Sequence, residues 1–280
     1  MLRFISLLSL PMVLSAAGLP PLAGVWKADL QKSTFQGPPP SNYLILFEQN
    51  GNEITETDLV ATPHGDRRSK TKFPIASEPT VTYFHGVPTR ITTVLNGNAL
   101  DLKAETAGRS DVTKQNFSLS ADGSVLTITS DMSAEGHQMH SILVLNKQPD
   151  SASAPLREPE KTAGDNFKNV KSELKTLPAS QFIDTMRYFS WALGKDCEFC
   201  HVRGKFDSDE KDEKKTARAM IQLVHDTNAQ FFKGEPEVKC YTCHQFHTHP
   251  LPRALVSGET VEQLEKQMEH AHEAEPKSGK

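Results

Sequence analysis

Hydrophobic and polar positions alternate with a period of two through the first half of the chain, as in Leu126 to Thr129. Turn sequences that tolerate positive φ, such as Asn96-Gly97 and Asp122-Gly123, separate the alternating stretches. This pattern predicts that residues 22–148 form an antiparallel meander, either a barrel or a sandwich, of about eight to ten short strands. The strands expected are 43–48, 53–60, 89–95, 99–105, 112–120, 124–131 and 139–146, after a first strand that leads on from Gly24.

The period becomes helical after residue 165. A stripe of Phe182, Met186, Phe189 and Leu193 predicts a helix over 179–193, with Pro178 in its first turn and Gly194 at its C-terminal stop. A second helix is predicted over 213–231. Its expected buried face carries Ala217, Met220, Ile221, Val224 and Phe231. The fold class predicted is therefore α+β by domain, with a β-barrel or sandwich followed by a mainly α domain.

The polar, Pro/Ala/Ser-containing segment 149–164 separates the two textures and is interpreted as an interdomain linker. The mainly α domain is expected over 165–253. Residues 254–280 are expected to form a C-terminal helix near 261–271 and a tail. The helix carries a narrow apolar stripe, which we expect to dock on the domain before it.

The N-terminus has the layout of a secretory signal peptide. Arg3 precedes an apolar run from Phe4 to Leu14, and Ser15-Ala16-Ala17 supplies small residues for cleavage after Ala17. The run is shorter than the roughly 20 apolar residues of a membrane-spanning helix, so a retained anchor is the lesser alternative. No later stretch is apolar and long enough to span a bilayer. The protein is therefore expected in the periplasm or another compartment outside the cytoplasm.

Composition excludes a few classes of function. The formal net charge is −4, which argues against a dedicated nucleic-acid binder. A dense run of charges at Asp207 to Lys215 is expected to be a solvated loop and helix start, with a docking patch for a charged partner as the alternative.

All four cysteines lie in two copies of one motif, Cys197-Glu198-Phe199-Cys200-His201 and Cys240-Tyr241-Thr242-Cys243-His244. This C-x-x-C-H pattern is the attachment sequence of c-type haem. The two thiols add to the two vinyl groups of the porphyrin, and the adjacent histidine supplies an imidazole nitrogen to the iron. Two covalently bound haems are therefore expected.

Other uses of two C-x-x-C pairs explain the sequence less well. A Cys₄ zinc site does not need a histidine after each pair, and the pairs are far apart along the chain. Disulfides or a thioredoxin-like redox motif also leave both histidines unexplained.

A low-spin haem needs a second axial ligand. Met186 lies on the apolar stripe of the helix before the first motif and is the expected partner of His201. Met220 is the expected partner of His244. The alternatives for this second haem are His225 and a histidine after the motif, His247 or His249, while a methionine can also simply fill a gap in the core.

The stretch from Asn166 to Pro252 resembles half of the tetrahaem cytochrome c subunit of photosynthetic reaction centres and its shorter dihaem relatives. The resemblance is carried by Met186 with Leu193-Gly194, by Thr216 to Met220 with Asn228, and by Cys240 to His244. It implies that Met186 and Met220 are haem ligands. Two departures are the presence of only two motifs and Gln245-Phe246 in place of the usual Arg-Gly.

The opening Gly24-Val25-Trp26 resembles the start of lipocalin-like barrels, in which the tryptophan closes one end; a plain core aromatic is the alternative.

These features favour an exported electron carrier over an enzyme. The expected partners are redox proteins of unknown identity. One alternative is a haem oxidoreductase such as a dihaem peroxidase, which needs an open iron site. The other is a ligand-binding β-domain with an accessory cytochrome domain.

Overall fold

The computed structural model describes residues 22–35, 38–62, 65–134 and 137–251, together with residues 260, 263 and 266. The expected signal peptide and most of the expected C-terminal helix lie outside these residues. The chain divides into two compact units, residues 1–84 with 88–158 and residues 85–87 with 159–280.

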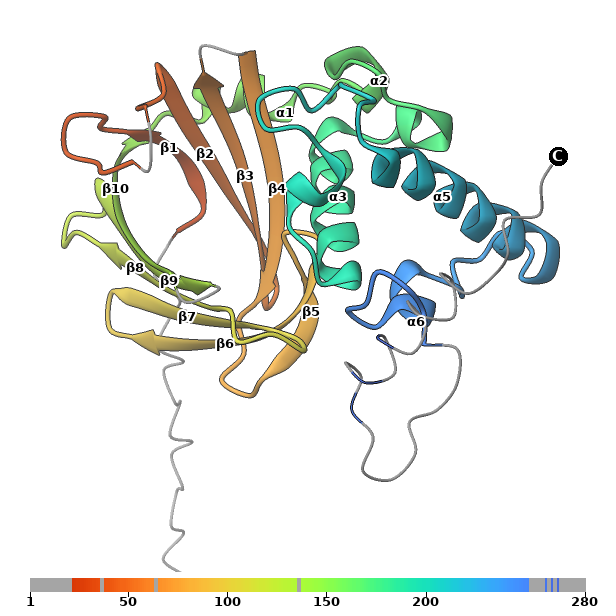
Figure 1. Cartoon of the computed structure of the whole chain (residues 1–280). Coiled ribbons are helices and arrows are strands. Elements are labelled where there is room, and N and C mark those ends of the chain that lie inside the picture. Colours follow the sequence, from red (N-terminus) through yellow and green to blue (C-terminus); the bar gives the residue numbers. More distant parts are fainter. Residues whose placement is uncertain are drawn as a thin grey trace, which may run out of the picture. The chain divides into compact units, whose positions relative to one another are not determined.

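The first unit is built on one antiparallel sheet of ten strands that curves into a nearly closed barrel (Figure 1). Neighbouring strands follow the order β4-β3-β2-β1-β10-β9-β8-β7-β6-β5, so the chain runs up and down and β1 pairs with β10. The predicted barrel or sandwich is therefore a barrel. Its strands are β1 Gly24–Ala28, β2 Asn42–Asn50, β3 Glu53–Thr62, β4 Gly65–Pro74, β5 Thr80–Phe84, β6 Val87–Asn96, β7 Ala99–Thr106, β8 Val112–Leu119, β9 Val125–Ala134 and β10 His137–Gln148.

Trp26 lies in the main hydrophobic core of this unit and is fully buried. Its indole nitrogen donates to the carbonyl oxygen of Leu22 at 2.8 Å, so its polar atom is satisfied. Phe117 packs at a ring-centroid distance of 6.1 Å from Phe47 and 5.9 Å from Phe73. These aromatic side chains fill the interior where the strands place them on the same face.

One part of the interior is polar. Asp58 of β3 is buried, and its carboxylate oxygens accept from the Tyr43 hydroxyl and the Ser69 hydroxyl, each at 2.9 Å. Burial raises the pKa of Asp58 to about 6, although the two hydrogen bonds act in the opposite direction.

Strands β4 and β5 are absent from the sequence-based expectation. β4 reads Gly-Asp-Arg-Arg-Ser-Lys-Thr-Lys-Phe-Pro, and only a few of its side chains are apolar. β5 lies at an edge of the sheet and exposes Val81 and Tyr83. Pairing with β3 decides the conformation of β4, which has few apolar side chains. β5 does alternate threonine with Val81 and Tyr83, a short strand signal that the sequence-based expectation missed.

The segment predicted as a linker contains helical turns. The 3₁₀ helix η1 (Asp150–Ser153) and α1 (Ala154–Arg157) bring Leu156 against Val25, Leu44 and Leu46 in a second hydrophobic cluster. This part of the segment therefore belongs to the first unit as packed structure.

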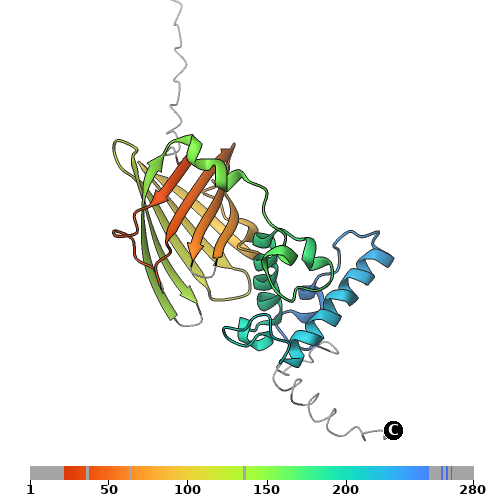
Figure 2. The ribbon, with the colours of Figure 1, turned by 90° about the horizontal axis from the view of Figure 1, so that it is seen from above.

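The second unit is helical (Figure 2). Its principal helix α3 (Ala179–Leu193) has the predicted bounds, and Gly194 caps it in the left-handed conformation at φ 63°. The long helix α5 begins one residue earlier than predicted, at Asp212, and ends at Phe231. The remaining elements are α2 Ala163–Asn166, η2 Ser172–Thr176, α4 Cys197–Cys200 and α6 Cys240–His244.

The expected burial of one face of α5 holds only in part, because Ala217, Ile221 and Val224 are half-buried but Met220 and Phe231 are exposed. Met220 is 40% exposed and Phe231 is 68% exposed, and the buried residues of this helix are Lys214 and Asn228. A helical stripe shows which residues share a face, but burial also needs another segment of the chain over that face. Among the described helices, none is long and apolar enough to cross a membrane.

Candidate functional site

Both cysteine motifs form short helices with ordered starts. Helix α4 holds the first pair, and the side chain of Asp196 accepts a hydrogen bond from the backbone N–H of Phe199 at 3.0 Å. Helix α6 holds the second motif, and the hydroxyl of Thr242 accepts from the backbone N–H of Lys239 at 3.0 Å. The C-x-x-C spacing thus places the two sulfur atoms of each motif one helical turn apart.

The four cysteines are free thiols. Burial raises the pKa of the Cys200 and Cys240 thiols, so their protonated forms are favoured at neutral pH. In the described part of the chain, no group of three or more Cys, His, Asp or Glu residues converges as metal ligands would. Among the described residues, the four thiols are thus neither paired as disulfides nor gathered into one Cys₄ set.

Each motif histidine is oriented through the same ring nitrogen. Nδ1 of His201 lies 2.9 Å from the carbonyl oxygen of Phe206, and Nδ1 of His244 lies 2.9 Å from the carbonyl oxygen of His247. A carbonyl oxygen only accepts hydrogen bonds, so Nδ1 carries the proton in both rings. The lone pair of Nε2 is then available to a metal. In each histidine, the hydrogen bond to the carbonyl oxygen fixes the plane of the imidazole ring.

Burial lowers the pKa of His201, while its hydrogen bond to Phe206 acts in the opposite direction. The Phe206 ring also contacts the His201 ring, with centroids 5.4 Å apart. The neutral imidazole that metal coordination requires is thus the favoured form at this position.

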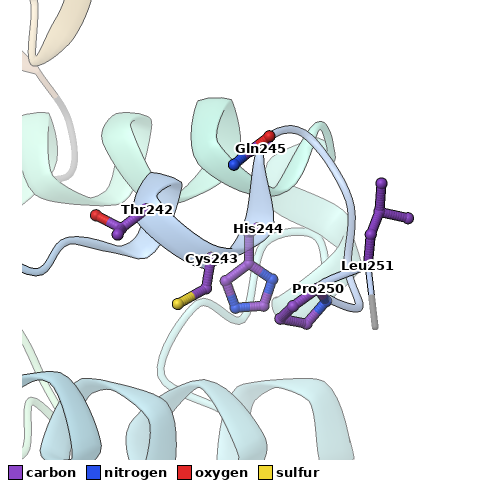
Figure 3. Close-up of a pocket in the computed structure, with 6 residues that line it drawn as sticks. All are labelled: Thr242, Cys243, His244, Gln245, Pro250 and Leu251. Atoms are coloured by element: carbon purple, nitrogen blue, oxygen red, sulfur yellow. The ribbon is translucent and has the colours of Figure 1, made fainter. Parts of the chain in front are cut away.

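A pocket of about 270 Å³ lies beside the second motif. It is lined by Thr242, Cys243 and His244 from α6, by Gln245, and by Pro250 and Leu251 of the following segment. Figure 3 shows the Cys243 sulfur and the His244 ring on the same side of α6. A thiol and an imidazole therefore meet one shared space.

Helix α3 packs against both motif helices. The Trp191 and Tyr241 rings stack with centroids 4.5 Å apart, and Phe246 meets Trp191 edge-on at 5.2 Å. The backbone N–H of Phe246 donates to the carbonyl oxygen of Ala192 at 2.9 Å. Tyr241, one of the two variable residues of the second motif, therefore anchors α6 to α3.

The chain reverses after the second motif through two non-glycine residues with positive φ, Gln245 at 45° and Phe246 at 72°. This is the point where the sequence departs from the usual Arg-Gly. A side chain in the left-handed region costs about 1–2 kcal/mol. The packing of Phe246 on Trp191 and Tyr241 offsets that strain.

Asn228 was not identified from the sequence as a structural link. Its side chain is buried and exchanges two hydrogen bonds with the backbone of Val238, at 2.8 Å and 2.9 Å. Val238 precedes Cys240 by two residues. Asn228 shares a face with the apolar residues of this helix, which was the available signal, but its partner is visible only in three dimensions.

The charged run that was expected to be solvated contains a buried lysine that binds the loop before it. Lys214 is 9% exposed and donates to the carbonyl oxygens of Phe206 at 2.9 Å and Ser208 at 2.7 Å. Asp209 lies 3.3 Å from Lys214 and 3.0 Å from Arg218. The four-residue spacing of the two cations indicates a shared helix face, but it does not predict that Lys214 is buried.

The predicted methionine ligands lie on the predicted helices. Met186 is half-buried on α3, which packs against α4, and Met220 is on α5, which also packs against α4. Of the alternatives, His225 and His249 are exposed. The backbone of His247 lies at the Nδ1 side of His244, away from Nε2.

Comparisons with known proteins agree with the motifs. The family described as photosynthetic reaction centre cytochrome C subunit matches residues 122–278, more than half of the chain. Cytochrome c-554 of Chloroflexus aurantiacus is 38% identical over 84 residues, 28% of this chain and 20% of that protein. The photosynthetic reaction center cytochrome c subunit of Thermochromatium tepidum is 35% identical over 95 residues, 32% of this chain and 23% of that protein.

The chain thus matches about a fifth of the length of these curated relatives. A solved structure similar to the first unit is a secretory abundant heat soluble protein from Ramazzottius varieornatus. It is 12% identical, with a TM-score of 0.35, and the match covers 47% of this chain and 97% of that one.

Proposed function

This chain belongs to the family of the photosynthetic reaction centre cytochrome c subunit, and we propose that it is an exported dihaem c-type cytochrome that carries electrons between redox partners. The observation that carries the proposal is the repeated arrangement of the two motifs. Each motif presents two free thiols beside an imidazole whose Nδ1 is hydrogen-bonded to a backbone carbonyl oxygen.

The donor set fits haem c. Cys197 and Cys200 would hold one haem and Cys240 and Cys243 the other, each through a thioether bond formed when a thiol S–H adds across a vinyl C=C bond. Nε2 of His201 and Nε2 of His244 would each bind the iron of the haem that its own motif holds. When bound, the haem iron supplies a one-electron couple between its ferric and ferrous states.

The protein's contribution is to hold the ligands still. The carbonyl groups of Phe206 and His247 fix both imidazole planes, and the stacked Trp191 and Tyr241 attach the second motif to α3. A fixed ligand set changes little when an electron arrives, which keeps the reorganisation energy of transfer low.

We assign the second axial positions to Met186 for the His201 haem and Met220 for the His244 haem. Thioether ligation raises the reduction potential relative to bis-histidine ligation. Met220 is 40% exposed, so it does not fill a gap in the core, which supports a ligand role over that alternative. The signal-peptide pattern of the N-terminal residues supports export, and covalent haem c is assembled outside the cytoplasm.

The haem count is tested by producing the protein in a host with a haem c maturation system. We expect two haems per chain by pyridine haemochrome and a haem stain that survives denaturation. The double variants Cys197→Ala/Cys200→Ala and Cys240→Ala/Cys243→Ala should each retain one. A measured mass equal to that of the polypeptide without haem would contradict the proposal.

The axial ligands are tested with Met186→Ala and Met220→Ala. Each should change the spectrum and lower the potential of one haem, while Met132→Ala, on strand β9, should change neither. A high-spin signal in the wild-type protein, or a spectral change with peroxide or carbon monoxide, would instead favour the dihaem peroxidase alternative.

A further inference from the structure

The carbonyl oxygen of Phe206 accepts hydrogen bonds from two side chains. Nδ1 of His201 and Nζ of Lys214 each lie 2.9 Å from this oxygen. Lys214 is 9% exposed, and it also donates to the carbonyl oxygen of Ser208 at 2.7 Å. The Phe206 carbonyl, which orients the His201 imidazole, is therefore also hydrogen-bonded to the buried ammonium group of Lys214.

The charges around this oxygen do not cancel. Asp209 lies 3.3 Å from Nζ of Lys214 and 3.0 Å from the Arg218 guanidinium, so two cations share one carboxylate. The hydrogen bond from Arg218 holds the pKa of Asp209 well below its usual range, so the carboxylate stays ionised. Asn169 fixes the same loop by donating to Asp209 at 2.8 Å.

We propose that Lys214 is a positioning residue that raises the reduction potential of the haem bound at His201, through the Phe206 carbonyl and through its own charge. This inference rests on the proposed dihaem function. It identifies a residue outside the two motifs that sets the properties of one of the two sites.

The two effects of Lys214 have the same sign. A carbonyl oxygen that already accepts from an ammonium is a weaker acceptor for the imidazole N–H, so less electron density reaches Nε2. The weaker donor stabilises ferric iron less. A nearby positive charge also disfavours the extra positive charge of the ferric state.

The test is a spectroelectrochemical titration of the full-length holoprotein with mediator dyes. In Lys214→Met, the reduction potential of one of the two haems should fall by about 59 mV. This corresponds to a roughly tenfold smaller equilibrium constant for its one-electron reduction. Lys214→Arg keeps the charge, so the reduction potential of the same haem should stay close to its wild-type value. Lys215→Met removes an exposed neighbouring cation and should leave both potentials unchanged.

Asp209→Asn separates electrostatics from loosening of the loop. Removing this carboxylate should raise the potential of the same haem. If Lys214 and Asp209 only hold the loop in place, Lys214→Met and Asp209→Asn should instead shift the potential in the same direction. Shifts of the same sign, or an unchanged potential in Lys214→Met with two haems still attached, would overturn the inference. A wild-type chain without covalent haem would instead refute the proposed function.

Discussion

Asn228 joins α5 to the segment that leads into the second motif, and its removal should weaken the helical unit. Its Nδ2 donates to the carbonyl oxygen of Val238 at 2.8 Å, and its Oδ1 accepts from the Val238 N–H at 2.9 Å. Asn228 is 8% exposed, so water has little access to replace these bonds. Asn228→Ala leaves both backbone groups without their partner.

The expected loss follows from the cost of two unpaired backbone groups. A buried group that loses its partner costs about 1–3 kcal/mol. Val238 is half-buried, so water recovers part of this, and we expect about 2–3 kcal/mol less free energy of unfolding. Guanidinium unfolding followed by circular dichroism at the helical minimum measures it, since the longer helices belong to the second unit.

Asn228→Asp adds a pH test. The protonated carboxyl can donate to the Val238 carbonyl, but the ionised form faces it with a negative charge, so folding raises the pKa of this carboxyl above its unfolded value of about 3.9. The stabilising contribution is complete below the unfolded pKa and is lost as pH rises through the folded pKa. Gln230→Glu, exposed on the same helix, is the matched control.

Two results would refute this reasoning about Asn228. One is an Asn228→Ala variant within about 0.5 kcal/mol of wild type, the range of ordinary surface substitutions. The other is an Asn228→Asp variant whose stability depends on pH in the same way as that of Gln230→Glu.

Gly194→Ala should lower the unfolding temperature of the helical unit and reduce its free energy of unfolding by about 2 kcal/mol or more. Residue 194 has a φ of +63°, and a Cβ there would lie 2.3 Å from the carbonyl oxygen of Phe246. Gly204→Ala has φ +72° with no atom within 4 Å, and should lose only about 1 kcal/mol; equal losses would contradict the steric argument. In the barrel, burial raises the pKa of Asp58 to about 6, so its contribution to stability is complete below the unfolded pKa and is lost as pH rises through about 6. Denaturant unfolding from about pH 4 to about pH 7 should show Asp58→Asn removing up to about 3 kcal/mol of this dependence, whereas exposed Asp66→Asn should not; an unchanged dependence in Asp58→Asn would be the refuting result.

Local signals were sufficient where an element is bounded by its own residues. Helix α3 has the predicted bounds because Pro178 precedes its first turn and Gly194 takes the left-handed conformation at its end. Hairpins such as β6–β7 were predictable from Asn96-Gly97. Strand β4 was not, because it has few apolar side chains and its conformation depends on pairing with β3. Strand β5 is only five residues long, and its alternation of threonine with Val81 and Tyr83 was missed.

The amphipathic pattern of α5 illustrates a different limit. The stripe with Met220 and Phe231 shares one helix face as predicted, yet both side chains are exposed. Meanwhile Lys214, which belongs to a charged run, is buried by its bonds to two loop carbonyls. Polarity predicts burial poorly when a long side chain can bury its stem and satisfy its ammonium group.

The sequence alone determined the two C-x-x-C-H motifs and the family resemblance, because thioether attachment requires fixed residue types at a fixed local spacing. It also determined the division into strand-rich and helical halves, since hydrophobic period is a local property. Only the tertiary structure decided which carbonyls orient His201 and His244, that Lys214 shares one of them, and that Asn228 holds the approach to Cys240. These contacts are formed by loop closure and helix packing. Their geometry depends on the whole chain path, which no local pattern encodes.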